Sequence, residues 1–216
     1  MDEDLYDPAA RLELFPITAR IEGEQLSIAG CDLGKLAEEH GTPLYLYDQA
    51  TMDAAVAEYR AALARFYPGP SGITYAAKAF LCLAVAQWVQ HRDLWLDCTG
   101  AGEIAVAVAA GVDRRRILVH GVNKSAADLE AAIPVQSTLH DIYDEAGYVE
   151  GKAVAANALA GLLAAALRIE FDRDRLAEAD RIVDEARAAV GRMPYLAGYV
   201  ENTACEIRIE EARHER

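Results

Sequence analysis

The stretch Ile73-Thr74-Tyr75-Ala76-Ala77-Lys78 decides the fold that this sequence predicts. It is short, mostly apolar and strand-like, and a helical pattern opens directly after it at Ala79-Phe80. Two more strand-like runs begin near Leu94 and Ile117, at intervals of 21 and 23 residues, and helical stretches lie between them. Repetition of strands and helices at this spacing is typical of a parallel sheet with right-handed crossovers. The sequence therefore predicts an α/β fold with about three parallel strands.

Polar residues stand at the end of each predicted strand: Lys78, Asp97 and His120 are at or just past these ends. In α/β sheets, functional sites lie at the carboxyl ends of the strands. A lysine held at a rigid strand end can form a Schiff base with an aldehyde cofactor, and the alternative is an ordinary solvated charge. For Asp97 and His120 the alternatives are a strand-end cap and a loop histidine with satisfied hydrogen bonds.

Three motifs carry a resemblance to a known family. They are Tyr75-Ala76-Ala77-Lys78-Ala79-Phe80, Asp97-Cys98-Thr99-Gly100-Ala101-Gly102-Glu103-Ile104 and His120-Gly121-Val122-Asn123-Lys124-Ser125. In this order they resemble the cofactor-lysine motif and the next two motifs of the fold-type III pyridoxal-phosphate decarboxylases. The third is similar to the His-Gly-Asn-Asn-Lys-Ser stretch of the diaminopimelate decarboxylase branch. The resemblance covers roughly residues 11–133 and stops near Pro134.

The resemblance implies a cofactor, a reaction and a set of site residues. The cofactor is pyridoxal 5'-phosphate, held as an imine on Lys78, and its protonated ring accepts the electrons left when carbon dioxide departs. Asp97, Glu103 and His120 are then expected to face the cofactor. The substrate implied is a small amino acid, meso-diaminopimelate, and its product is L-lysine. Asn123 and Lys124 are expected to be structural, in a turn and at a solvated helix start.

The departures from the family are as informative as the matches. The family has an eight-stranded (β/α) barrel, and this chain supplies about three strands. It has no counterpart of the later cofactor-stacking histidine, the glycine-rich phosphate loop, the partner-subunit segment or the carboxyl-terminal β-domain. Val122 also replaces an asparagine. Three readings follow: a truncated or fused decarboxylase-like chain, a non-catalytic cofactor-binding module, and a chimeric helical interaction protein without catalysis.

The flanking regions complete the expected architecture. Residues 1–48 are predicted to form a β/helix segment, with strands at 14–21, 25–28 and 43–47 and a helix that Asp32 caps, that runs through Glu39 and that Gly41 ends. Residues 49–133 form the partial barrel, and residues 134–216 form an all-α tail. Within this tail, 134–151 is expected to be a loop. The apolar helix at 153–167 is expected to cover the open face of the sheet.

Composition narrows the function classes. The formal net charge of −14 argues against nucleic acid and anionic membranes as partners. The apolar stretch at 153–167 is shorter than the ~20 residues of a membrane span. Four scattered cysteines indicate reduced thiols in the cytoplasm and no metal site. An exposed parallel-sheet edge predicts a homo-oligomer or pairing through that edge.

Overall fold

The computed structural model describes residues 8–121 and 124–215, so Asn123 and the substitution at Val122 lie outside the described residues. The chain divides into two compact units, residues 1–73 and 74–216. Helices and strands of the first unit are η2 Pro8–Leu14, β1 Arg20–Glu22, β2 Gln25–Ile28, β3 Cys31–Asp32, α1 Leu33–His40 and α2 Gln49–Phe66. Those of the second are β4 Thr74–Ala76, η3 Ala77–Ala79, α3 Leu83–His91, β5 Trp95–Cys98, α4 Ala101–Ala109, η4 Arg114–Arg116, β6 Ile117–Val119, α5 Ala126–Glu145, α6 Val149–Ile169, α7 Arg173–Ala189, η5 Val190–Arg192, η6 Pro194–Leu196 and α8 Ala197–His214.

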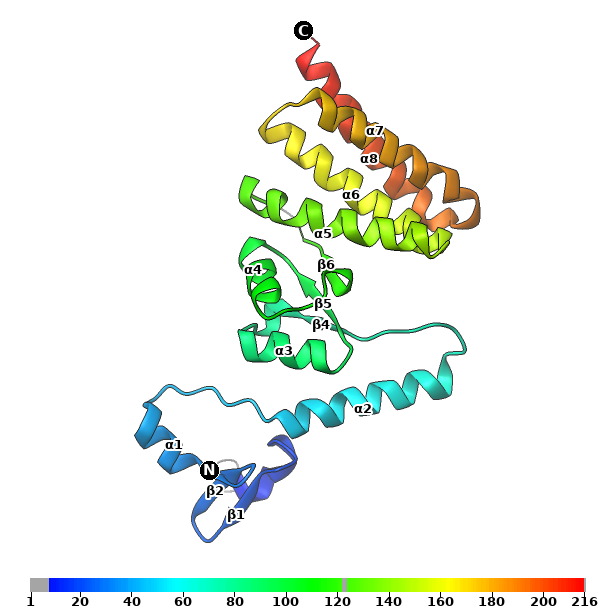
Figure 1. Ribbon diagram of the computed structural model, residues 1–216. Coiled ribbons are helices and arrows are strands. Elements are labelled where there is room, and N and C mark those ends of the chain that lie inside the picture. The colour runs from blue at the N-terminus through cyan, green and yellow to red at the C-terminus, as the bar shows by residue number, and fades with distance from the viewer. Residues whose placement is uncertain (1–7, 122–123, 216) are drawn as a thin grey trace, which may run out of the picture. The chain divides into compact units, whose positions relative to one another are not determined.

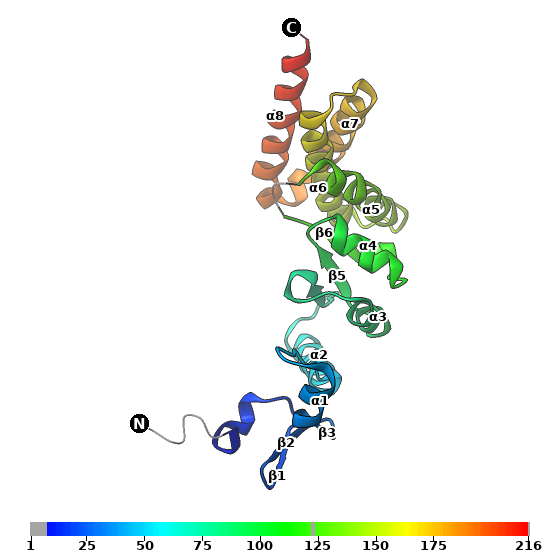
Figure 2. The same cartoon turned by 90° about the vertical axis from the view of Figure 1, so that its left-hand side faces the viewer.

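The predicted three-stranded parallel sheet is confirmed. Its strand order is β4-β5-β6, and Ala76 lies opposite Asp97, which lies opposite Leu118. Figure 2 shows α3, α4 and α5 following one another along one side of these strands. Helices on a single side of a parallel sheet are the arrangement of a (β/α) barrel sector. The strands supply one sector, and closure of a barrel is not part of the described structure.

The two faces of the sheet have different surroundings. Leu96, Cys98 and Ile117 are fully buried and point toward the helices, because side chains alternate between the faces of a strand. On the edge strand β4, Tyr75 makes a T-shaped contact with Trp88 of α3, so its side chain also points toward the helices. Residues of the opposite parity, including Asp97 and Leu118, therefore share the other face. This second face carries the polar strand-end residues.

The loop predicted at residues 134–151 is wrong, because α5 continues as a helix through Pro134 to Glu145. The start of this helix is as the sequence indicates: Ser125 and Asp128 form a reciprocal capping box. A proline inside a helix removes one backbone hydrogen bond and crowds the preceding turn. Here the buried side chains Leu129, Val135 and Leu139 flank the proline on both sides, and their packing outweighs its cost.

Replacing Pro134 should stabilise the second unit. Its side chain is exposed, so Pro134→Ala loses little packing and restores a helix-interior N–H. We expect the free energy of unfolding to rise by about 1–3 kcal/mol. Urea unfolding followed by circular dichroism measures this. Pro194→Ala is the matched control, since Pro194 opens a short helix, where proline fits without penalty. An equal gain in both variants would contradict the helix-interior explanation.

Helices α6, α7 and α8 pack with α5 into a bundle (Figure 1). The inner face of α7 contributes Ala179, Ile182, Val183 and Ala186, which are all buried. The helix at 153–167 was predicted to cover the open face of the sheet, and this prediction is wrong. The helix α6 buries Leu159 and Leu163 in the core shared with α7 and α8, while α5 is the helix that contacts β6. The all-round apolar character of α6 reflects neighbours on several sides.

Helix α6 also exceeds the length expected from the sequence. Its 21 residues are long and apolar enough, by length and composition, to cross a membrane. However, 56% of its most apolar window is buried inside the protein. A helix enclosed by other helices has this property without any lipid, because its apolar side chains are already removed from water. We interpret α6 as the central helix of the bundle.

The first unit has little core of its own. Its hairpin of β1 and β2 and the helix α1, capped by Asp32, follow the prediction. The strand expected at 14–21 forms only from Arg20 onward, and 43–47 is not a strand. Within the described part of this unit, Ala19, Val56 and Asp48 are the fully buried side chains. Tyr45, Tyr59 and Phe66 are mostly exposed, so local turn and cap signals define this unit more than packing does.

Candidate functional site at the strand ends

Lys78 lies in the η3 turn, directly after β4. The hydroxyl of Tyr75 donates a 2.8 Å hydrogen bond to the carbonyl of Phe80, which ties the two ends of this turn together. The Lys78 side chain is exposed. Among the described residues, neither a hydrogen bond nor an ion pair from its ammonium group is found. The amine is therefore accessible and held on a defined turn, although it is not in contact with the acidic residues of the neighbouring strands.

Asp97 and His120 are brought together by the register of β5 and β6. The carboxylate of Asp97 forms a direct hydrogen bond with Nδ1 of His120. An ionised carboxylate only accepts, so Nδ1 is the donor of this bond. The Asp97 side chain is 18% exposed and that of His120 is 55% exposed. This Asp97–His120 pair is thus partly open to solvent, and the bond fixes the orientation of the imidazole ring.

Glu103 lies at the start of α4 and has local partners. Its Oε2 accepts hydrogen bonds from the backbone N–H of Thr99, at 2.6 Å, and from the Thr99 hydroxyl, at 3.0 Å. These contacts join the end of β5 to the first turn of α4. Such a carboxylate stabilises a helix N-terminus through the unpaired N–H groups there. The geometry thus gives Glu103 a capping function in this structure.

Lys124 lies directly before the N-cap of α5 and has a structural role, as predicted. The expected solvation of its side chain is incomplete, because the side chain is partly buried. Its ammonium group donates to the carbonyls of Thr99 and His120, each at 2.8 Å. It therefore joins the chain just past β5 to the chain just past β6. In the sequence, these contacts were indicated only by the presence of a lysine in the motif that begins at His120. A lysine at that position does not specify which carbonyl groups it will bind.

Asp128 joins α5 to α4. Its Oδ1 accepts from the backbone N–H of Ala101 at 2.7 Å, and its Oδ2 accepts from the backbone and hydroxyl of Ser125. Gly100 permits this approach, since a Cβ there would lie 2.9 Å from Oδ1 of Asp128. The Ala101 bond first, and then those from Ser125, lower the pKa of Asp128 to about 2. The carboxylate is thus ionised at neutral pH and holds two helix starts.

This lowered pKa predicts a dependence of stability on acid. The Asp128 pKa is below its ordinary value of 3.8, so its contribution is present above pH 4 and is lost as the pH falls toward 2. We expect Asp128→Ala to unfold at a lower temperature than the unmodified chain at pH 7, and the difference to shrink between pH 4 and pH 2. Thermal unfolding at several pH values measures it. Glu130→Ala, an exposed position on the same helix, is the control. A difference independent of pH would contradict the assignment.

The thiol of Cys98, on β5 beside Asp97, is not placed to act as a nucleophile at this site. It is fully buried on the helix-facing side of β5. Burial, with the nearby charges of Glu103 and Asp97, raises its pKa to about 12. A neutral buried thiol is a poor nucleophile. Within residues 8–121 and 124–215, no group of three or more histidine, cysteine or acidic side chains is placed to hold a metal ion.

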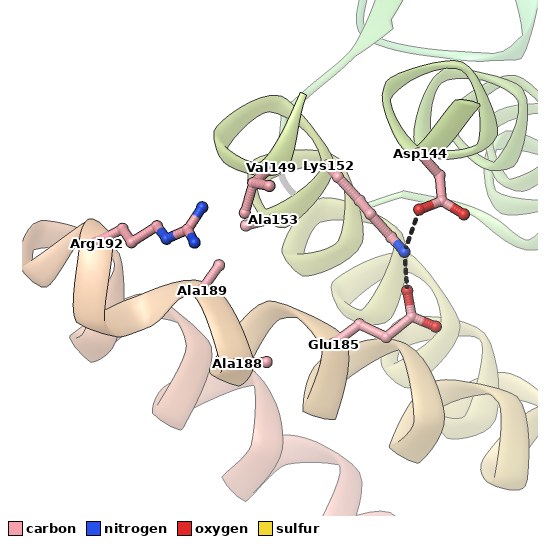
Figure 3. A pocket seen from close by; sticks show the side chains of 8 residues that line it. All are labelled: Asp144, Val149, Lys152, Ala153, Glu185, Ala188, Ala189 and Arg192. Atoms are coloured by element: carbon pink, nitrogen blue, oxygen red, sulfur yellow. Dashed lines mark hydrogen bonds and ion pairs between the residues drawn. The ribbon is translucent and has the colours of Figure 1, made fainter. Parts of the chain in front are cut away.

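Two cavities of the second unit lie close to the strand ends or within the helical bundle. One, of about 410 Å³, adjoins His120 and is enclosed by β6, α5 and the start of α6. Lys78 is not on its wall. The other, of about 360 Å³, lies between α5, α6 and α7 (Figure 3). There Lys152 contacts Asp144 at 2.7 Å and Glu185 at 3.1 Å, and these bonds raise the Lys152 pKa. Lys152, Asp144 and Glu185 are thus paired with one another, and Arg192 also lines this cavity.

Comparison with known proteins gives a consistent family. Residues 50–172 match the model of the pyridoxal-dependent decarboxylase, pyridoxal binding domain. The match extends through α5 and α6, beyond the point near Pro134 where the quoted motifs stop. Over 117 residues, 54% of the chain, it is 44% identical to a diaminopimelate decarboxylase of Mycobacterium tuberculosis. Over 141 residues, 61% of the chain, it is 36% identical to the diaminopimelate decarboxylase of Synechocystis sp..

The coverage of these relatives is partial. The aligned regions are 25% and 30% of the lengths of those two relatives, so the chain spans only a part of them. Among solved structures, a diaminopimelate decarboxylase from M. jannaschii superposes with a TM-score of 0.50 at 23% identity. The superposition covers 66% of this chain and 33% of that one. It supports the α/β fold of the strand–helix region.

Proposed function

Because the chain belongs to the pyridoxal-dependent decarboxylase family, we propose that it binds pyridoxal 5'-phosphate through Lys78 and serves a diaminopimelate decarboxylase-like reaction. The observation that carries the proposal is the accessible Lys78 amine on a turn at the carboxyl end of β4, within the matched residues 50–172. The substrate proposed is meso-diaminopimelate and the product L-lysine, from the identity to diaminopimelate decarboxylases. The chain would act as part of a larger catalytic assembly.

The residues at the strand ends fit one end of this cofactor. An aldehyde condenses with an accessible primary amine, and the Lys78 side chain is exposed and has no carboxylate partner among the described residues. The phosphate end is served less well. At the N-terminus of α4, a common phosphate-binding element, the Ala101 N–H already donates to Asp128, and Glu103 places a second carboxylate in the first turn. The described structure thus supports anchoring through the lysine and supplies few phosphate ligands.

The division of labour among this chain's residues follows from their contacts. The bound cofactor supplies an electron sink for the carbon that loses carbon dioxide. Lys78 anchors it, and the hydrogen bond between the Asp97 carboxylate and Nδ1 of His120 fixes the orientation of the imidazole ring. Lys124 keeps His120 in register with β5. We propose that Asp97, His120 and Glu103 face the cofactor. Glu103 also joins the end of β5 to the first turn of α4 through its bonds with Thr99.

A second candidate function is cofactor binding without turnover. It is favoured by the capped α4 N-terminus, because catalysis requires preorganised groups around the whole cofactor while attachment requires one amine. The third reading, an interaction protein built on the helical tail, is favoured by the bundle of α5 to α8. Release of carbon dioxide from meso-diaminopimelate by the isolated chain would select the catalytic reading over both.

We also propose a cytoplasmic location and assembly with other chains. Cys31, Cys82, Cys98 and Cys205 are all free thiols, as expected in a reducing compartment. In the described sheet, β4 pairs with β5 alone, so one of its edges is available to another strand. Sedimentation of the purified chain over a range of concentrations tests self-association through this edge.

One experiment tests the cofactor proposal directly. The chain has four lysines, Lys35, Lys78, Lys124 and Lys152. Incubation with pyridoxal phosphate, reduction with borohydride and peptide mapping would locate the attached cofactor. Lys124 and Lys152 are engaged with carbonyls and carboxylates, so we expect the label on Lys78. Labelling spread equally over Lys35 and Lys78 would overturn the proposal, since both are exposed and only their surroundings differ.

A further inference from the structure

The cavity beside His120 has a distinctive wall, and we refer to it as the tyrosine cavity. It encloses about 410 Å³, within the usual range for small-molecule sites. Aliphatic and glycine residues of β6, α5 and α6 form most of its floor. The polar or aromatic side chains that line it are His120, Gln136, Tyr143, Tyr148, Glu150 and Tyr195. Every one of these residues belongs to the second unit.

The charged groups that line the tyrosine cavity favour a cation over an anion. Among the described residues that line it, none is lysine or arginine, and Glu150 is the one carboxylate. The histidine that lines it, His120, is hydrogen-bonded to the carboxylate of Asp97. The chain as a whole carries a formal charge of −14. An anion entering this cavity would meet no opposite charge, whereas a cation would be attracted by both the local and the overall field.

The aromatic rings are arranged as a recognition surface. Tyr143 and Tyr148 meet edge to face with their centroids 5.5 Å apart. Gly151 makes this arrangement possible, because a Cβ there would overlap the ring of Tyr148. Burial raises the pKa of Tyr143, so its phenol stays neutral. Neutral tyrosine rings attract organic cations through their negative faces.

A polar group is also placed at the buried end. Gln136 is 4% exposed, and its amide nitrogen donates one long bond, 3.4 Å, to the carbonyl of Ala155. No fully buried side-chain oxygen or nitrogen in the described structure lacks a hydrogen-bond partner. The amide oxygen of Gln136, which has no such partner, is therefore accessible from the cavity that Gln136 lines. A buried amide facing a mostly apolar cavity can accept a hydrogen bond from a ligand.

From this arrangement we propose that the tyrosine cavity binds an organic ammonium ion with an apolar body. The ammonium group lies against Glu150 and the tyrosine rings at the mouth, and the apolar body fills the floor beside β6. The site is formed by the bundle together with β6 and does not require the Lys78 amine. It is thus separate from the cofactor anchor, although His120 belongs to both surroundings.

Three probes of one skeleton test the proposal. They are 2-phenylethylammonium, the neutral 2-phenylethanol and the anion 3-phenylpropionate, each titrated by calorimetry into the chain without pyridoxal phosphate. We expect the cation to bind about tenfold more tightly than the alcohol, from one carboxylate and two ring faces, and the anion to bind most weakly. Equal binding of all three, or no binding of the cation at millimolar concentration, would overturn the proposal.

Variants locate the binding. Glu150→Gln should reduce the affinity for the cation to that for the alcohol, and Tyr148→Leu should weaken it several-fold. Glu145→Gln makes the same charge change on an exposed glutamate outside the cavity wall and should leave the preference intact. Thermal unfolding of each variant verifies the fold. An equal loss in Glu145→Gln would show a general charge effect. Lys78→Ala should bind the cation normally, which separates failure here from failure of the cofactor proposal.

Discussion

Lys78→Ala is expected to abolish site-specific attachment of pyridoxal phosphate, so that the borohydride-reduced label falls to the background of the other lysines. The reason is chemical, because the aldehyde condenses with a primary amine and alanine offers none. The loss should be all or none at this position, which makes it the largest effect predicted for the chain. Peptide mapping of the reduced protein measures it. Lys78→Arg should give the same loss, since a guanidinium keeps the charge and stays protonated.

The control for this variant is Lys35→Ala. Lys35 is exposed on α1, as Lys78 is exposed on η3, but it does not lie at the end of a parallel strand. Its removal should leave the labelling of Lys78 unchanged. The fold should survive both changes, because neither side chain is buried. If Lys78→Ala retained the label at an unmodified level, the anchor would lie elsewhere and the decarboxylase-like reading would lose its central residue.

Leu163→Ala is expected to lower the free energy of unfolding by about 2–5 kcal/mol, the range for removing a fully buried leucine. Leu163 is 1% exposed in the core shared by α6, α7 and α8, where Ile182, Val183 and Val200 are also buried. The truncated side chain leaves a cavity that neighbours on several helices cannot all move to fill. The midpoint of urea unfolding, followed by helical circular dichroism, measures this change.

The matched control is Ile209→Ala on α8. Ile209 is an aliphatic side chain of similar size on a neighbouring helix, but it is 50% exposed. Its truncation should cost less than about 1 kcal/mol, because much of its surface is already in water. If both variants unfolded alike, α6 would not be the central helix of the bundle. A helix placed in lipid rather than in this core would also fail to show the difference.

Much of the site's framework was predictable from local sequence. Strand–helix spacing placed Lys78, Asp97 and His120 at the carboxyl ends of three neighbouring strands, and the structure has these strands in parallel. Caps were also local signals, since Ser125 and Asp128 form their capping box within one turn. The expected cofactor contacts of Asp97, Glu103 and His120 stay predictions. Long-range contacts were not predictable, such as the bond from Lys124 to Thr99, because nothing in the spacing specifies that partner.

Errors arose where packing outweighed local preference. Pro134 signalled a helix end, yet buried neighbours on both sides carry α5 through it. The aromatic run at 43–47 has strand propensity, yet it pairs with no strand in the described structure. Propensity describes the free energy of forming a helix or strand within one segment. Tertiary packing can outweigh an unfavourable propensity, as at Pro134, and a favourable propensity gives no strand where no partner strand is present, as at 43–47.

The sequence by itself determined the order of the three parallel strands and the helices between them, the strand-end position of Lys78 and the family to which the chain belongs. These depend on residue identity and spacing along the chain, which a single sequence contains. Only the tertiary structure decided which helix covers β6, which carboxylates are already engaged at the start of α4, and that α5 and α6 enclose a tyrosine-lined cavity beside His120. These depend on contacts between residues far apart in the chain, and their energy arises from burial and pairing that no local pattern encodes.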